Sequence, residues 1–280
     1  MNENESAKCT AEDCSSCGAD CSSRMQDNVN DKAGHPWSDV RKVIGVVSGK
    51  GGVGKSLVTA SMAVAMRARG NAVGIMDADI TGPSIPKMFG IEERAQANDQ
   101  GILPGVSRDG ISMISMNMLL DNDTDPVVWR GPIIGGAVKQ FWTDVQWMYQ
   151  DYLFVDMPPG TGDVALTVFQ SMPVDGIIIV TTPQDLVSMI VEKAVKMANE
   201  MKIPILGIVE NMSWMECPDC GKKLYPFGES HISEIVEKYH IPLIGQIPLD
   251  PQIAALADAG KIEDIKTEWL APAADVLGSL

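Results

Sequence analysis

The chain has 280 residues, 45% of them hydrophobic, with 22 basic and 37 acidic side chains and a net charge of −15 at pH 7. A surface this acidic repels nucleic acid and anionic lipid, and no stretch reaches the about 18 uncharged apolar residues of a membrane span. We therefore expect no nucleic-acid and no membrane partner. The polar, acidic start is unlike a signal peptide, so we expect a cytoplasmic protein whose six cysteines form no structural disulfides.

Residues 1–40 differ from the rest in composition. They are rich in Asn, Asp, Ser and Gly and nearly devoid of aliphatic side chains, so we expect a flexible tail and linker, followed by a folded domain over residues 41–280. Four cysteines form a C-x4-C-x2-C-x3-C array: Cys9, Cys14, Cys17 and Cys21. This tight, His-free spacing predicts metal binding and is closer to ferredoxin-type cluster ligation than to a zinc finger, with Zn²⁺ as the competing metal.

A glycine-rich run follows the first apolar strand, expected over residues 42–47, and leads into a buried helix over residues 56–69. The run fits the phosphate-binding pattern G-x-x-x-x-G-K-[ST]. Its residues are Gly49, Lys50, Gly51, Gly52, Val53, Gly54, Lys55 and Ser56. Glycines let backbone amides approach phosphate oxygens, and we expect Lys55 on the β- and γ-phosphates of ATP and the Ser56 hydroxyl on Mg²⁺.

Further apolar strands alternate with helical segments down the chain. The strands are expected over residues 72–77, 111–116, 152–156, 176–180, 205–209 and 243–247. Such alternation predicts an α/β fold, a doubly wound and mostly parallel sheet with helices on both faces. Residues 262–280 are expected to form a helix that is interrupted at Pro272 and packs on the domain.

Carboxylates end two of these strands, and ligands of parallel sheets bind at that edge. Asp156 lies where an acidic residue would hold Mg²⁺, directly or through water. The N–H of Gly160 could contact the γ-phosphate, and Asp79 could orient the attacking water. Ordinary strand-end turns also favour Asp and Gly, and for Asp77 and Asp79 that interpretation is about as well supported.

A C-x-x-C pair, Cys217 and Cys220, follows the strand at 205–209. Two thiolates at this spacing chelate one metal, but a tetrahedral site needs four ligands. A symmetric dimer could complete the site with two thiolates from each subunit, which suits zinc or a bridging iron–sulfur cluster. The alternative interpretations of this pair are a thioredoxin-like redox motif and free thiols without a function.

Taken together, four motifs resemble the Mrp/ApbC/Nbp-type iron–sulfur cluster carriers, P-loop ATPases of the MinD/ParA/nitrogenase iron protein class. They lie at residues 50–56 (a deviant Walker A loop), 77–84, 156–163 and 210–220, and the resemblance runs from about residue 41 to 258. It implies a homodimeric ATPase that holds a labile [4Fe–4S] cluster between subunits and passes it to apo-proteins.

By position, the resemblance also implies roles for single residues. Lys50 would reach the partner's nucleotide, Asp79 would assist the water, and Asn211 and the loop at Pro248 would lie near the adenine. With Lys50, Lys55 and Asp79 as catalytic residues, we expect slow ATP hydrolysis, because a carrier needs switching rather than flux. The alternatives are a zinc-containing, nucleotide-switched regulator and a ParA/MinD-like positioning ATPase.

Overall fold

The computed structural model describes residues 32–79, 82, 84–119, 131–160, 162–184, 187–228 and 230–280. The four tail cysteines lie outside these residues. One compact unit runs from Gly34 to Leu280, so it starts before the boundary expected at residue 41. His35 is buried in this unit, where its Nε2 lies 2.7 Å from the carbonyl oxygen of Gln100.

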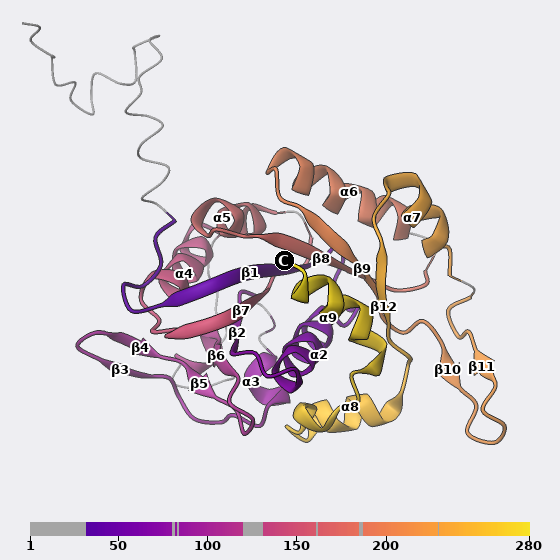
Figure 1. The fold of residues 1–280 in the computed structure, drawn as a ribbon, viewed down its shortest axis with the longest axis horizontal. Coiled ribbons are helices and arrows are strands. Elements are labelled where there is room, and N and C mark those ends of the chain that lie inside the picture. Colours follow the sequence, from indigo (N-terminus) through magenta and orange to yellow (C-terminus); the bar gives the residue numbers. More distant parts are fainter. Residues whose placement is uncertain are drawn as a thin grey trace, which may run out of the picture. The chain divides into compact units, whose positions relative to one another are not determined.

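An eight-stranded sheet forms the centre of this unit, in the order β12-β9-β8-β1-β7-β2-β6-β5 (Figure 1). Its strands are β1 (Asp39–Ser48), β2 (Val73–Asp77), β5 (Gly105–Val106), β6 (Ser112–Ile114), β7 (Tyr149–Asp156), β8 (Gly176–Thr181), β9 (Ile205–Glu210) and β12 (Leu243–Gln246). All neighbours pair in parallel except β5 and β6. The expected mostly parallel sheet is confirmed, and so are its six predicted later strands.

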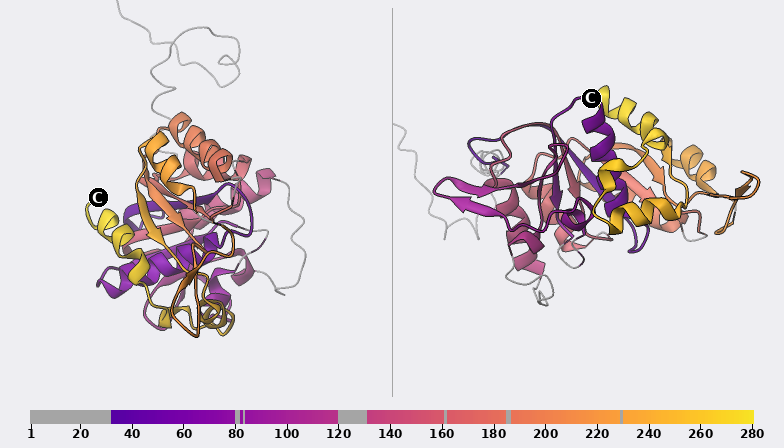
Figure 2. Two further views of the ribbon diagram at one scale, coloured as in Figure 1. Left: turned by 90° about the vertical axis from the view of Figure 1, so that its right-hand side faces the viewer. Right: turned by 90° about the horizontal axis from the view of Figure 1, so that it is seen from below.

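Helices cover both faces of the sheet, as the doubly wound fold requires (Figures 1 and 2). One core joins the sheet to α4 (Gly131–Thr143), α5 (Asp163–Ser171), α6 (Val187–Glu200) and α7 (Ile232–Tyr239). The other joins it to α2 (Lys55–Ala68), α3 (Ile85–Met88), α8 (Pro251–Asp258) and α9 (Ala271–Gly278). Strand β1 contributes Val43 and Val47 to the first core and Ile44 and Val46 to the second, which explains its unbroken apolar run.

Two short hairpins lie outside the main sheet. They are β3 (Gln96–Asn98) with β4 (Gly101–Leu103), and β10 (Met215–Glu216) with β11 (Lys223–Leu224). The sequence did not predict them, because strands of two or three largely exposed residues carry no apolar pattern. The second hairpin carries Cys217 and Cys220.

The chain's last segment corrects one expectation. Instead of a helix interrupted at Pro272, residues 262–264 and 268–270 form single 3₁₀ turns and Pro272 lies in the first turn of α9. Proline is favoured there, because the first N–H groups of a helix have no partner within it. The expected packing is confirmed, since Ala273, Ala274 and Leu277 of α9 are buried against the domain.

Candidate functional site

The glycine-rich loop joins the end of β1 to the start of α2 and borders a cavity of about 510 Å³. Residues 50–56 all line this cavity, as does Asp79. Gly52 and Gly54 have φ of +80° and +78°, a left-handed conformation that side chains with a Cβ disfavour. The structure therefore places seven of the eight predicted loop residues at one cavity, beside the N-terminus of a buried helix.

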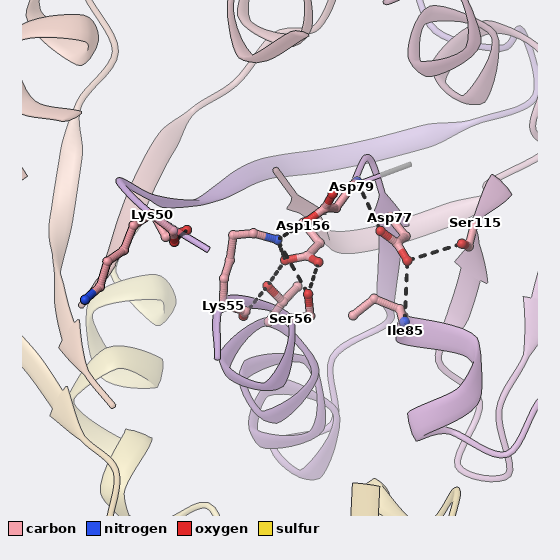
Figure 3. Close-up of polar contacts among 10 residues, drawn as sticks. Lys50, Lys55, Ser56, Asp77, Asp79, Ile85, Ser115 and Asp156 are labelled. Atoms are coloured by element: carbon pink, nitrogen blue, oxygen red, sulfur yellow. Dashed lines mark hydrogen bonds and ion pairs between the residues drawn. The ribbon is translucent and has the colours of Figure 1, made fainter. Parts of the chain in front are cut away.

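Two buried side chains, Lys55 and Asp156, point toward each other beside the loop (Figure 3), and Lys55 lines the cavity. Lys55 Nζ lies 2.7 Å from Oδ1 of Asp156, and the two side chains are 6% and 0% exposed. The Ser56 hydroxyl donates to Oδ2 of Asp156 at 2.5 Å, and that of Thr59 donates to Oδ1 at 2.8 Å. Strand pairing explains the meeting, because β7 ends at Asp156 next to β1, which leads into the loop.

The residues present fit Mg²⁺ as well as a phosphate. The Ser56 hydroxyl and the Asp156 carboxylate are hard oxygen donors already held against each other, which is the donor type that Mg²⁺ prefers. Lys55 adds a positive charge that is available to phosphate oxygens if it leaves Asp156.

Asp77 is the last residue of β2, the other neighbour of β7, and Asp79 follows two residues later. Asp79 Oδ2 lies 3.7 Å from Lys55 Nζ, whereas Asp77 is 1% exposed and accepts from the Ser115 hydroxyl at 3.2 Å and from two backbone amides. Burial raises the pKa of Asp77 to about 8, and the Asp156 carboxylate adds to the rise. The two aspartates thus differ: Asp79 faces the cavity, and Asp77 is a buried structural carboxyl.

The raised pKa of Asp77 predicts a pH dependence of stability in the chain without nucleotide and Mg²⁺. Because its folded pKa lies above the ordinary value of 3.8, the folded state binds the additional proton. The stabilisation is complete below about pH 4 and is lost as the pH rises to about 8. In thermal denaturation from pH 5 to 8.5, the midpoint should fall less for Asp77→Asn than for the wild type; parallel curves would contradict this.

Two predicted site residues lie turned away from the Lys55–Asp156 pair. Lys50 lines the cavity, but its side chain points away from Asp156 and its Nζ donates to Oε1 of Gln184 (Figure 3). The N–H of Gly160 donates to the carbonyl of Ser48 at 2.8 Å. In this conformation neither group faces the centre of the phosphate site.

Asn211 lies directly beneath the phosphate loop. It is 1% exposed, and its Nδ2 donates to the carbonyl oxygen of Val53 at 2.9 Å. Pro248 follows β12 and is half-buried, and neither residue borders the cavity that the loop lines. The loop at Pro248 is nevertheless joined to the Asn211 segment, because Ser213 N–H donates to the carbonyl of Ile247 at 3.0 Å.

The contact with Asn211 leaves less room for a side chain at Gly54 than at Gly51 or Gly52. A Cβ at Gly54 would lie 2.2 Å from Nδ2 of Asn211, whereas at Gly51 and Gly52 nothing lies within 4 Å. We expect Gly51→Ala to leave the free energy of unfolding nearly unchanged. Gly52→Ala should lower it by about 1–2 kcal/mol because of the left-handed backbone there, and Gly54→Ala should lower it further. Urea denaturation of the nucleotide-free proteins measures the order, and equal losses at Gly52 and Gly54 would contradict it.

The far wall of the cavity was not predicted from the sequence. It comes from α3 and α8, through Ser84, Lys87, Met88, Ala254, Ala257 and Asp258. Alanine and methionine in a helix are typical of a core, so no pattern distinguishes them as cavity residues. Lys87 was the one signal available, an exposed cation just after the Asp77 to Ser84 motif.

Cys217 and Cys220 lie in the turn between β10 and β11, which projects beyond β12 at the edge of the sheet (Figure 1). The Gly221 N–H donates to the carbonyl of Cys217 at 2.9 Å, and Gly221 has the left-handed φ of +70° that such a turn needs. Backbone N–H groups of Asp219 and Cys220 lower the pKa of the Cys217 thiol. Cys217 is half-buried and Cys220 is exposed.

These two thiols have no further metal ligand near them among the described residues. Nowhere in the described residues do three or more His, Cys, Asp or Glu side chains converge so that they could hold a metal ion. The turn therefore offers two thiols, and the lowered pKa of one of them favours its thiolate, the form of cysteine that can bind a metal. Among the helices that the structure describes, none has the length and apolar character needed to cross a membrane.

A glycine-rich loop between a strand and a helix, with lysine and aspartate at its base, defines the class of P-loop NTPases. Comparison with known proteins gives the family. The family model described as ParA, NUBPL iron-transfer P-loop NTPase, matches residues 39–276. The chain belongs to this family, and the resemblance found in its motifs is confirmed.

Individual relatives agree. The iron–sulfur cluster carrier protein of Clostridium perfringens is 43% identical over 273 residues, 94% of each chain, and that of Saccharolobus solfataricus is 48% identical over 225 residues, 80% of this chain and 76% of the relative. A solved nucleotide-binding protein of Archaeoglobus fulgidus, in complex with ADP and with cobalt found in it, is 41% identical with a TM-score of 0.75, covering 88% of this chain and 94% of that one. MinD of Aquifex aeolicus in its MinC complex, 18% identical with a TM-score of 0.61 over 85% of this chain and 96% of that one, shows the fold alone.

Proposed function

We propose that this chain is an ATP-dependent carrier that binds a labile [4Fe–4S] cluster across a homodimer and transfers it to apo-proteins. The observation that carries the proposal is the half-site at Cys217 and Cys220: two thiols on a projecting turn, one with a lowered pKa, and no third ligand among the described residues. A second copy related by two-fold symmetry supplies the missing two thiolates. The names of its relatives as cluster carriers support the same cargo.

At the nucleotide site, the loop amides and Lys55 bind the phosphates of ATP. Lys55 exchanges Asp156 for phosphate oxygens, which leaves Asp156 and Ser56 to hold Mg²⁺. When bound, Mg²⁺ neutralises charge on the β- and γ-phosphates. Asp79, at 3.7 Å from Lys55, orients the attacking water, and Lys50 releases Gln184 to reach the nucleotide of the partner subunit.

Nucleotide exchange then changes how tightly Cys217 and Cys220 ligate the cluster. The Gly160 N–H donates to the Ser48 carbonyl in this conformation. Once that hydrogen bond is broken, the N–H can donate to the γ-phosphate instead. Such a cycle calls for slow turnover, since each hydrolysis resets one carrier. Several turnovers per second from the isolated protein would speak against it.

The test is transfer itself. Protein reconstituted anaerobically with iron and sulfide is mixed with an apo-ferredoxin, with and without MgATP, and cluster appearance in the ferredoxin is followed by circular dichroism. Direct transfer that an added iron chelator does not intercept supports the proposal. No transfer, or transfer fully blocked by the chelator, overturns it and favours the zinc-containing regulator if tightly held zinc is found instead.

A further inference from the structure

A buried carboxylate without a role in either site lies at the end of β9. Glu210 is 1% exposed, and the segment that follows it leads through the cysteine turn. We name residues 214–228, which include β10 and β11, the cysteine arm. The arm leaves the sheet just after Ser213 and returns at Ser230, so these two serines mark its ends.

The carboxylate of Glu210 binds both ends of the cysteine arm. Its Oε2 accepts a hydrogen bond from the Ser213 hydroxyl at 2.6 Å, and its Oε1 accepts one from the Ser230 hydroxyl. Gln246 of β12 donates to Oε2 at 3.0 Å, which ties the same carboxylate to the neighbouring strand. Three donors on two oxygens of one buried group make this an anchor that an amide or a shorter side chain cannot fully reproduce.

The next residue contacts the phosphate loop. Asn211, adjacent to Glu210 in the chain, donates to the Val53 carbonyl in the phosphate loop at 2.9 Å. Met212 follows with a φ of +57°, a left-handed conformation that is rare for a residue with a side chain. The strained turn directs the chain from the phosphate loop back toward Ser213 and the arm, and strain of this kind is typically kept where function requires it.

We propose that Glu210 is a positioning residue that couples the nucleotide site to the thiols of Cys217 and Cys220. Through Ser213 and Ser230 it holds both ends of the arm, and the adjacent Asn211 joins the same segment to the phosphate loop. Nucleotide binding at the loop therefore changes the exposure of the two thiols, and the Glu210 anchor transmits the change. This inference rests on the proposed function for its purpose, but it concerns the cluster-free chain and is testable without a cluster.

The experiment measures alkylation of Cys217 and Cys220 by iodoacetamide in the full, metal-free chain, resolved by peptide mass spectrometry, with and without MgADP. In the wild type we expect MgADP to change the rate about fivefold or more, the lower range of coupling between two sites. In Glu210→Ala the rate without nucleotide should rise and the MgADP effect should vanish, while MgADP still binds. Glu210→Gln, which keeps one oxygen and the size of the side chain, should restore part of the effect.

Glu263→Gln is the matched control, because the Glu263 side chain is also buried and accepts from a serine, Ser107 at 2.5 Å, but its bonding partners lie at residues 107–109 and not in the arm. It should lower stability without changing the MgADP effect. A wild-type rate that MgADP leaves unchanged, or an undiminished effect in Glu210→Ala, overturns the inference. If Glu210→Ala does not fold, an undiminished MgADP effect on the alkylation rate of Glu210→Gln overturns the inference. Cluster binding by the proposed carrier is tested separately, and it fails if the wild type takes up no iron at Cys217 and Cys220.

Discussion

Replacing Cys217 and Cys220 together by alanine is expected to abolish iron uptake at the cysteine arm and, with it, cluster transfer. The turn supplies two thiols and no third ligand among the described residues, so nothing nearby can substitute for them. The fold should be unaffected, since Cys220 is exposed and Cys217 is half-buried on a projecting hairpin. Anaerobic reconstitution followed by iron and sulfide analysis measures the effect.

The reciprocal variant provides the control. Serine in place of Cys9, Cys14, Cys17 and Cys21 leaves the arm intact and should leave transfer intact, whatever metal those four residues bind. If a variant that combines these four serines with alanine at Cys217 and Cys220 retained full iron uptake, the arm would not be the cluster site. ATP binding by both variants should match the wild type, which shows that the loss is local.

Replacing Lys55 by alanine is expected to reduce ATP hydrolysis by about 10²-fold or more, because it removes the cation that we propose contacts the phosphates in the transition state. The change also leaves the fully buried Asp156 carboxylate without its cation at 2.7 Å, and the Ser56 and Thr59 hydroxyls are then its donors among the described residues. Loss of one partner of a buried pair costs on the order of 3–5 kcal/mol, so the unfolding midpoint should fall as well.

Steady-state phosphate release and calorimetric ADP titration measure the Lys55 effect, with circular dichroism to verify the fold. Lys261→Ala, at an exposed lysine after α8, is the control and should behave as the wild type. A folded Lys55→Ala protein that hydrolyses ATP within tenfold of the wild type would contradict the assigned role.

The sequence predicted those features whose chemistry is local. Residues 50–56 are recognisable because a phosphate loop needs glycine, lysine and serine at fixed spacing, and the sheet because its strands are apolar on both faces. The role assigned to Asp79 came from its position after a strand and from the resemblance, and those of Asn211 and Pro248 came from the resemblance alone. All three remain predictions. The structure adds that Asn211 holds the Val53 carbonyl in this conformation.

What the sequence could not predict depends on tertiary packing. The cavity wall from α3 and α8 is made of side chains that look like core residues, and the anchor at Glu210 joins residues 210, 213, 230 and 246 through a carboxylate that has no motif of its own. The misplaced break at Pro272 has a similar origin, because proline both ends helices and begins them, and only the neighbouring turns decide which.

The cluster site shared by two chains is the central claim, and one measurement tests it most directly. The variant with serine at Cys9, Cys14, Cys17 and Cys21 is reconstituted anaerobically, and iron, sulfide and zinc are counted per chain alongside molar mass by light scattering. We predict about two irons and two sulfides per 30.1 kDa chain, the share of a four-iron cluster held by two chains, in a particle of twice that mass. A monomer, or zinc without iron uptake, would contradict it.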